Sequence, residues 1–166
     1  MGRTTELRRE IKQRFIPMVI SKGFTADNRY APNFLGFRKV TAEAVYVFDI
    51  QWEKYGSPRF VINFGKCSGK GVISHGEFVP PAEVTPAQTP FMGRLQPKRG
   101  GGLSCWFRQD RLLWEWALSG KRFYSASEVV TKLIELFPEV ETYWSTGNIG
   151  PHIHALPPIP WLRDAV

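Results

Sequence analysis

The chain has 166 residues, of which 43% are hydrophobic and 14% aromatic, and its formal net charge is +7. This length predicts one domain, residues 1–166, with a hydrophobic core of its own. Two cysteines are too few for a disulfide framework, and no apolar run approaches the ~18 residues that span a bilayer, so disulfide-stapled and membrane-spanning proteins are excluded. The first residues lack the apolar segment of a secretory signal, so we expect a cytoplasmic protein without a membrane partner.

Positive charge is concentrated in two blocks of the sequence. Residues 1–40 contain nine Lys/Arg and three acidic residues, and residues 91–122 contain seven and two. Such blocks fit a nucleic-acid or other polyanion partner, or an acidic protein. They fit equally well a basic surface that has no specific polyanion partner, because net charge speaks to solubility and non-specific binding.

The N-terminal segment predicts an amphipathic helix. Its apolar residues recur at helical spacing, with basic residues on the opposite side: Leu7, Ile11, Phe15, Met18 and Val19. Thr4 or Thr5 can cap this helix. Pro17 lies inside the pattern and is expected to kink the helix or split it at Ile16, because proline lacks the backbone N–H and crowds the preceding turn.

The central stretch, VYVFDIQWEKYGSPRFVINFG at 45–65, predicts a β-hairpin around which the chain is organised. Bulky residues alternate with smaller or polar ones in both arms, and the period of two places each set on one face of a sheet. The aromatic face, which includes Phe48, Ile50 and Ile62, has to be buried under helices or a second sheet. The opposite face carries Asp49, Gln51 and Asn63 among valines. These three side chains are a candidate binding site, or simply the solvated face of an antiparallel sheet.

The segment from about 72 to 97 is rich in proline and predicts a long, irregular connection, a kind of loop that tends to be functional or mobile. Short strands are possible at Val72–Ile73 and Phe78–Val79. The residues that follow, LSCWFR at 103–108 and RLLWEWAL at 111–118, predict a second hairpin with Trp106 and Trp114 as cross-strand neighbours. Residues 113–118 could instead be helical, although the alternation of Trp114 and Trp116 favours a strand.

Aromatic and basic residues alternate around this second predicted hairpin. Lys98 and Arg99 precede Trp106 and Arg108. Aromatics interleaved with positive charge are typical of sites that bind single-stranded nucleic acid, but such aromatics more often belong to a core. We therefore treat these four residues as candidate binding residues with two possible readings.

The last part of the chain predicts a capped helix and an extended tail. Ser125 and Glu128 form a capping box, and apolar residues continue at helical spacing to Phe137. The proline-rich tail, about 147–166, is expected to be an extended strap. Within it His152 and His154 lie two residues apart, so both imidazoles would point to one side of an extended chain, as two metal ligands do. No third donor lies at a recognisable spacing, so surface or packing histidines are the simpler interpretation, and no cofactor is predicted.

The order of features in the first 65 residues resembles a bacterial family. FIPMVISKGF, the strand with Phe37 and Arg38, VYVFDIQW and RFVINFG follow one another as in domain of unknown function number 4304. The likeness is looser beyond them. The resemblance implies no established activity and no catalytic residues. Small stand-alone bacterial domains of this kind are sometimes immunity proteins or other partner-binding proteins, which is an analogy of class.

Together these patterns predict an α+β fold: a largely antiparallel β-sheet with an N-terminal and a C-terminal helix packed on one face. No convincing catalytic set emerges. The first functional hypothesis is a cytoplasmic, non-catalytic domain that binds another protein. The alternatives are a nucleic-acid or polyanion binder that uses the basic segments, and an enzyme or metal-binding protein that uses His152 and His154.

Overall fold

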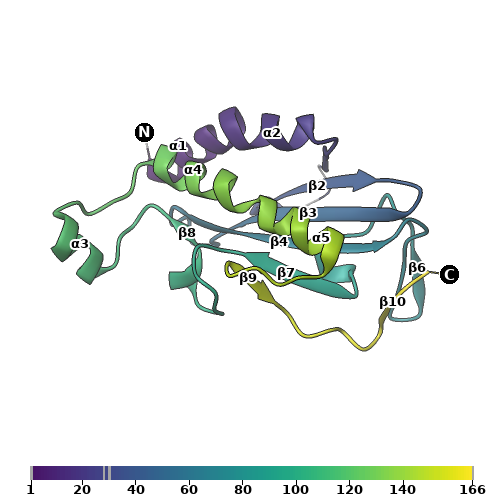
Figure 1. Cartoon of the computed structure of the whole chain (residues 1–166). Coiled ribbons are helices and arrows are strands. Elements are labelled where there is room, and N and C mark those ends of the chain that lie inside the picture. Colours follow the sequence, from purple (N-terminus) through teal and green to yellow (C-terminus); the bar gives the residue numbers. More distant parts are fainter. Residues whose placement is uncertain (1, 28, 30, 166) are drawn as a thin grey trace.

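A computed structural model describes residues 2–27, residue 29 and residues 31–165 of the chain. Figure 1 shows one layer of helices lying over one face of a twisted sheet, with a short helix standing apart from both. Within the described residues the main sheet has seven strands and every pairing in it is antiparallel. The α+β class, the antiparallel sheet and the helices from both parts of the chain are thus confirmed. The predicted domain bounds themselves, residues 1 and 166, lie outside the described residues.

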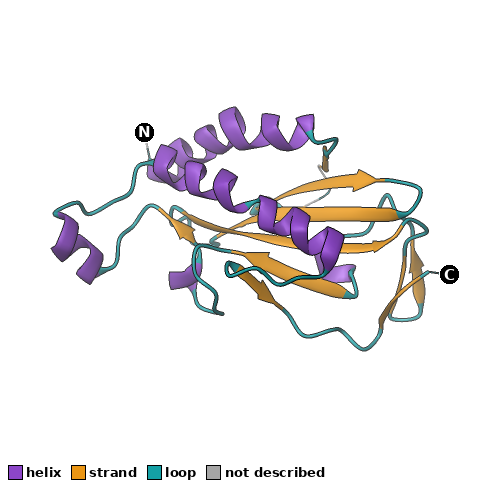
Figure 2. Ribbon diagram, in the orientation of Figure 1, coloured by secondary structure: helices purple, strands orange, loops and turns teal. Residues whose placement is uncertain are grey.

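The sheet is built around the predicted central hairpin (Figure 2). Its strands run in the order β1 (Thr25–Asp27), β2 (Phe34–Val40), β3 (Ala44–Trp52), β4 (Arg59–Ser68), β7 (Phe91–Leu95) and β9 (Ile153–Ala155), and β8 (Phe107–Arg108) pairs with the start of β4. The β3–β4 register places Phe48 opposite Phe64 and Asp49 opposite Asn63. This register keeps all the bulky residues of both arms on one face.

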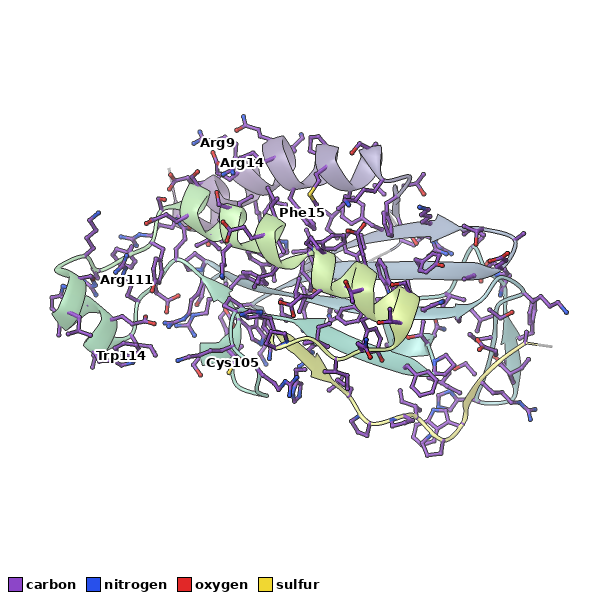
Figure 3. The ribbon with its side chains drawn as sticks, viewed as in Figure 1. Arg9, Arg14, Phe15, Cys105, Arg111 and Trp114 are labelled. Atoms are coloured by element: carbon purple, nitrogen blue, oxygen red, sulfur yellow. The ribbon has the colours of Figure 1, made fainter. Side chains whose placement is uncertain are left out.

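Helices from both parts of the chain bury that aromatic face. The N-terminal helical segment consists of α1 (Arg3–Glu10), a π-helical turn η1 (Ile11–Phe15) and α2 (Ile16–Ser21); α4 (Ala126–Leu136) and α5 (Pro138–Thr146) cover the rest. Phe48, Ile50 and Ile62 are completely buried. Phe15 packs edge to face with Phe137, at 5.2 Å between ring centroids, which joins the two helical segments above the sheet (Figure 3). Full burial of a side chain of this size contributes about 1.5–3 kcal/mol.

The predicted N-terminal helix is correct in position but its caps differ. Gly2, rather than Thr4 or Thr5, is the N-cap residue. A new helical segment starts at Ile16, where Pro17 was expected to split the helix. The π-helical turn directly precedes this point, because a wider turn accommodates a proline ring that would otherwise crowd the carbonyl one turn earlier.

The opposite face of the sheet is only partly open, which corrects the expectation of a solvated face. The proline-rich connection contains β5 (Val72–Ser74), β6 (Glu77–Val79) and the short helical turn η2 (Pro86–Gln88), so it is more regular than predicted. Together with β10 (Leu162–Asp164), which pairs with β5, this segment folds back onto the sheet. A small second core forms there from Val45, Val47, Cys67, Val72 and Val84.

The second predicted hairpin is wrong, and the helical alternative for residues 113–118 is correct. After β8 the chain leaves the sheet, and residues Leu113–Ser119 form helix α3. Alternation of apolar residues such as Trp114 and Trp116 indicates a strand with one buried face. That inference fails here because α3 has no buried residue. Trp106 is buried whereas Trp114 is exposed, so the two are not cross-strand neighbours.

Among the described residues, no helix combines the length and the apolar character that a membrane span requires.

Candidate binding site

The predicted polar cluster on the sheet forms, but its members bind one another. The amide nitrogen of Asn63 donates to Asp49 Oδ1 at 2.8 Å and to Gln51 Oε1 at 3.0 Å. Arg94 of β7 in turn donates to Asn63 Oδ1 at 2.9 Å. Asp49 and Asn63 are almost fully buried. Burial raises the pKa of Asp49 to about 7, against the lowering effects of the Asn63 hydrogen bond and of Arg94. These side chains therefore hold strands together, and none of Asp49, Gln51 and Asn63 lines the cavity described below or the two others of similar kind.

The two histidines have separate partners. His152 Nδ1 lies 2.6 Å from Glu139 Oε1 of α5, whereas His154 pairs in the β7–β9 register with Arg94. The described residues contain no group of three or more His, Cys, Asp or Glu that could hold a metal ion.

Cys67 is not suited to act as a nucleophile. Burial raises the pKa of its thiol to about 12, which disfavours the thiolate that a nucleophile needs.

Three of the four remaining candidate residues meet at one cavity. Lys98, Trp106 and Arg108 line a cavity of about 400 Å³ between β8 and α4. Arg99 does not join them, because its guanidinium donates to the backbone oxygens of Ile153 and Gly150 at 3.0 and 2.8 Å. It anchors the C-terminal tail to the chain that precedes η3 (Leu103–Cys105).

Beside this cavity projects a structure that we call the α3 arm, residues 109–124. At its base two antiparallel chain segments meet: the N–H of Arg111 donates to the carbonyl of Arg122, and that of Tyr124 donates to the carbonyl of Gln109, at 3.2 and 2.7 Å. Gly120, at φ 66°, ends the helix in the left-handed conformation that glycine adopts without strain. Figure 1 shows α3 at the tip, away from the sheet and the other helices.

An ion pair fixes the orientation of α3. Arg108 Nη2 donates to both oxygens of Glu115, at 3.1 and 2.9 Å, and both side chains are largely buried. The same carboxylate accepts the N–H of Leu112 at 2.7 Å, which satisfies one backbone donor at the start of the helix. Glu115 therefore faces the body of the protein.

The outward face of α3 is apolar, which inverts the usual arrangement of a surface helix. Residues follow one another at about 100° around a helix, so Leu113 lies nearly opposite Glu115, while Trp114 and Leu118 lie on one flank of the helix between these two. Leu113 and Leu118 are 80% and 81% exposed, and Trp114 is 55% exposed. Figure 3 shows Trp114 beside α3 and Arg111 between α3 and the body of the protein.

Basic residues surround this apolar tip. Lys98 Nζ lies 5.7 Å from the centroid of the Trp114 ring, and the arm itself carries Arg111, Lys121 and Arg122. The only carboxylate of α3, Glu115, is already paired with Arg108. The exposed surface of the arm thus combines large apolar side chains with an excess of positive charge.

The wide basic block of residues 1–40 does not form a comparable surface. Several of its cations bind groups of the chain itself: Arg14 donates to Ser127 and Thr131, Lys22 pairs with Glu141, and Arg38 pairs with the buried Asp27 at 2.5 Å. These contacts join the first helices to α4 and α5, and β2 to β1.

Sequence reasoning found the cavity residues, but at α3 it favoured a strand over the helix that it gave as the alternative. The signal was present: three large apolar residues around Glu115, followed by Ser119 and Gly120, fit a short helix with a glycine cap. Nothing in the spacing indicated that the apolar side of this helix would face outward, because that depends on the Arg108–Glu115 contact.

Comparison of the chain with family models, with curated proteins and with solved structures found no match. The resemblance of its first 65 residues to domain of unknown function number 4304 stays a prediction.

Proposed function

We propose that this protein is a cytoplasmic, non-catalytic binding domain that docks on another protein through the α3 arm. The observation that carries the proposal is the inverted polarity of α3, whose apolar side faces outward and whose carboxylate faces inward. Exposed apolar clusters of this kind, with charged residues around them, mark interaction sites on proteins.

The binding mode that fits is a helix in a groove. Such helices insert anchors spaced i, i+3, i+4 and i+7 into an apolar groove. Trp114 and Leu118 have the i, i+4 spacing, and Leu113 adds a further exposed apolar side chain next to Trp114. Tryptophan is among the residues that most often dominate binding energy. A free helix of seven residues is not stable in water, so the Arg108–Glu115 pair and the base of the arm keep it ordered before binding.

Charge decides which partner fits. The basic residues around the tip favour a groove with an acidic rim, because complementary potentials speed association and exclude wrong partners. A second copy of this chain is a poor occupant, since pairing two α3 arms would bring their basic residues together.

The test compares two double variants in partner capture from the native host. Leu113→Ala/Leu118→Ala removes outward apolar surface while it keeps good helix formers at both positions. The matched control, Tyr55→Ala/Phe78→Ala, removes exposed apolar side chains at sites away from the arm. We expect a stoichiometric partner with wild type and with the control variant, and its loss with the α3 variant.

The captured protein is then purified and titrated with each variant. The proposal requires at least tenfold weaker binding for the α3 variant, unchanged binding for the control, and weaker binding at high salt. If light scattering showed that the wild-type protein is a dimer and that the α3 variant is a monomer, the arm would be a self-association surface instead. Binding of the arm to anionic lipid vesicles or to single-stranded nucleic acid, with no protein partner, would also overturn the proposal.

A further inference from the structure

A second binding function is suggested by the cavity between β8 and α4. At about 400 Å³ it falls within the range of roughly 300–1,000 Å³ that is typical of small-molecule sites. Its residues come from the chain before η3, from β8, from the arm and from α4: Pro97, Lys98, Ser104, Trp106, Phe107, Arg108, Glu115, Tyr124, Glu128, Val129 and Lys132. Strands and a helix that belong to the main core support these walls.

The walls are mainly apolar and aromatic. Trp106, Phe107 and Val129 are buried, and Tyr124 is held on its other side by the guanidinium of Arg111, 4.0 Å from its ring centroid. Phe107 stacks on Phe60 of β4 at 5.0 Å between centroids, so this wall is continuous with the core. Such walls favour a flat apolar group, because aromatic rings pack against one another face to face or edge to face.

The charged groups at the cavity do not contribute equally. Both acids already have structural partners: Glu115 binds Arg108, and Glu128 accepts the N–H of Ser125 at 2.7 Å in the helix cap. That hydrogen bond also lowers the pKa of Glu128. Lys98 has no ion pair among the described residues, and Lys132 has only a long contact of 3.9 Å with Glu135. The groups available to a ligand are therefore cations.

Trp106 adds an unused hydrogen-bond donor in the wall. Only 7% of the surface of Trp106 is exposed. No residue among those described accepts a hydrogen bond from its Nε1. A buried N–H without an acceptor is unfavourable, and an acceptor brought by an occupant would relieve this cost.

We infer that this cavity binds a carboxylate carried on an aromatic body. The ring packs against Trp106, Phe107 and Tyr124, and the carboxylate accepts hydrogen bonds from the ammonium groups of Lys98 and Lys132. The same chemistry is offered by a small aromatic acid and by a protein chain that ends in phenylalanine. The inference does not depend on docking through α3, because Leu113 and Leu118 do not line the cavity.

The experiment follows the indole N–H signals of the intact protein by nuclear magnetic resonance. The signal of Trp106 is assigned as the one that disappears in Trp106→Phe. We expect phenylacetate to shift it in a saturable way, and phenethylamine, which has the same ring and the opposite charge, to leave it in place. Absence of a saturable shift with phenylacetate, or an equal shift with phenethylamine, would refute the inference.

Variants then test whether Lys98 and Lys132 bind the carboxylate of the ligand. Lys98→Gln/Lys132→Gln is expected to weaken phenylacetate binding about tenfold, whereas Lys12→Gln, an exposed lysine on the first helical segment, leaves it unchanged. Leu113→Ala/Leu118→Ala, which tests the proposed function, should not alter phenylacetate binding, so the two ideas can fail separately. A peptide that ends in phenylalanine with a free carboxylate is compared with the same peptide ending in an amide. Binding of the acid peptide would show that the cavity accepts a chain end as well as a small acid. Equal binding of the amide would count against a carboxylate site.

Discussion

At the scale of single residues, Asp49 is the most informative group because a carboxyl is buried without a cationic partner in contact. Its neighbours Asn63 and Gln51 are neutral, and Arg94 reaches Asn63 rather than Asp49. Burial disfavours the charged form, so the pKa of Asp49 rises to about 7 from the ordinary 3.8. The folded protein holds this proton over a pH range in which the unfolded chain has released it.

This difference predicts that stability depends on pH through Asp49. Between about pH 4 and pH 7 the folded state binds one more proton than the unfolded state, so the free energy of unfolding falls as the pH rises. The slope from this group is at most about 1.4 kcal/mol per pH unit, and it vanishes below the unfolded pKa and above the folded one. Asp49→Asn keeps an oxygen that can accept from Asn63 and removes the charge.

Asp49→Asn should therefore be more stable than wild type at pH 8, by about 1–3 kcal/mol, and similar to it at pH 4. Urea unfolding at a series of pH values measures both. Glu135→Gln, at an exposed position of α4, is the control and should leave the slope as in wild type. A variant with the wild-type slope between pH 4 and pH 7 would show that Asp49 is ionised throughout.

Gly65 is a second residue with a sharp expectation. A Cβ atom built there would lie 2.0 Å from Oγ1 of Thr89, which is fully buried and belongs to the segment that covers the sheet. Gly65→Ala should push this segment away and destabilise the fold by about 1–3 kcal/mol. Gly101→Ala, where a Cβ meets nothing within 4 Å, is the matched control. Equal thermal stability of the two variants would contradict the close packing of Thr89 on β4.

At the scale of elements, the order of α3 depends on the base of the arm and on one side chain of the helix, Glu115. Glu115 satisfies the N–H of Leu112 and binds Arg108, and no buried apolar side chain of α3 helps to hold it. Glu115→Gln cannot form the ion pair, so the amide hydrogens of Leu113–Ser119 should exchange faster by roughly tenfold or more. The backbone amides of α4 serve as an internal control, and their exchange rates should be unaffected. Unchanged exchange in α3 would mean that its order comes from elsewhere.

The elements differ in how far the sequence alone could predict them. The β3–β4 hairpin, the Ser125 cap and the N-terminal helix follow from periodicity and local capping chemistry. β7 was missed because its five residues sit after a run of prolines and contain Gly93, whose missing side chain makes room for Phe64. α3 was read as a strand because its pattern is short and its apolar residues are not facing a core.

The candidate site could be predicted only in part for a similar reason. Lys98, Trp106 and Arg108 stand out as aromatic and basic residues close in sequence, and they do meet at one cavity. Asp49, Gln51 and Asn63 also meet, but the sequence could not reveal that residues from about 72 to 90 cover part of this face. Their mutual hydrogen bonds lie within the predicted hairpin, but the fourth member of the network, Arg94, comes from β7, a part of the chain read as irregular.

At the scale of the whole molecule, contacts far apart in sequence attach the proline-rich connection to the sheet. Arg38 of β2 donates to the carbonyl oxygens of Pro81 and Val84 and pairs with Asp27. Arg38→Met keeps an unbranched, apolar stem and removes all three contacts. It leaves the buried Asp27 with its exposed neighbour Arg29, and we expect a loss of about 3 kcal/mol.

Limited proteolysis gives the local readout for this variant. Cleavage between residues 75 and 90 should become faster in Arg38→Met while cleavage elsewhere follows the global stability. Lys39→Met, which removes only a hydrogen bond to the carbonyl of Lys22, is the control on the adjacent residue. Uniform acceleration of all cleavage sites would indicate that Arg38 acts on the whole fold and not on this connection.

The arrangement of the molecule separates stability from recognition. The aromatic sheet face and the helices of both chain ends form the core, whereas α3 contributes nothing to it and stands apart (Figure 1). A surface that contributes nothing to stability and still exposes large apolar side chains is explained most simply by binding.

The most direct test is hydrogen exchange of the intact protein alone and in complex with its captured partner. Docking through the α3 arm predicts that the strongest protection on binding falls on the amides of Leu113–Ser119, with smaller changes at the base of the arm and none on β5 and β6. Protection confined to the sheet or to the first helical segment, with α3 exchanging as in the unbound protein, would contradict the account.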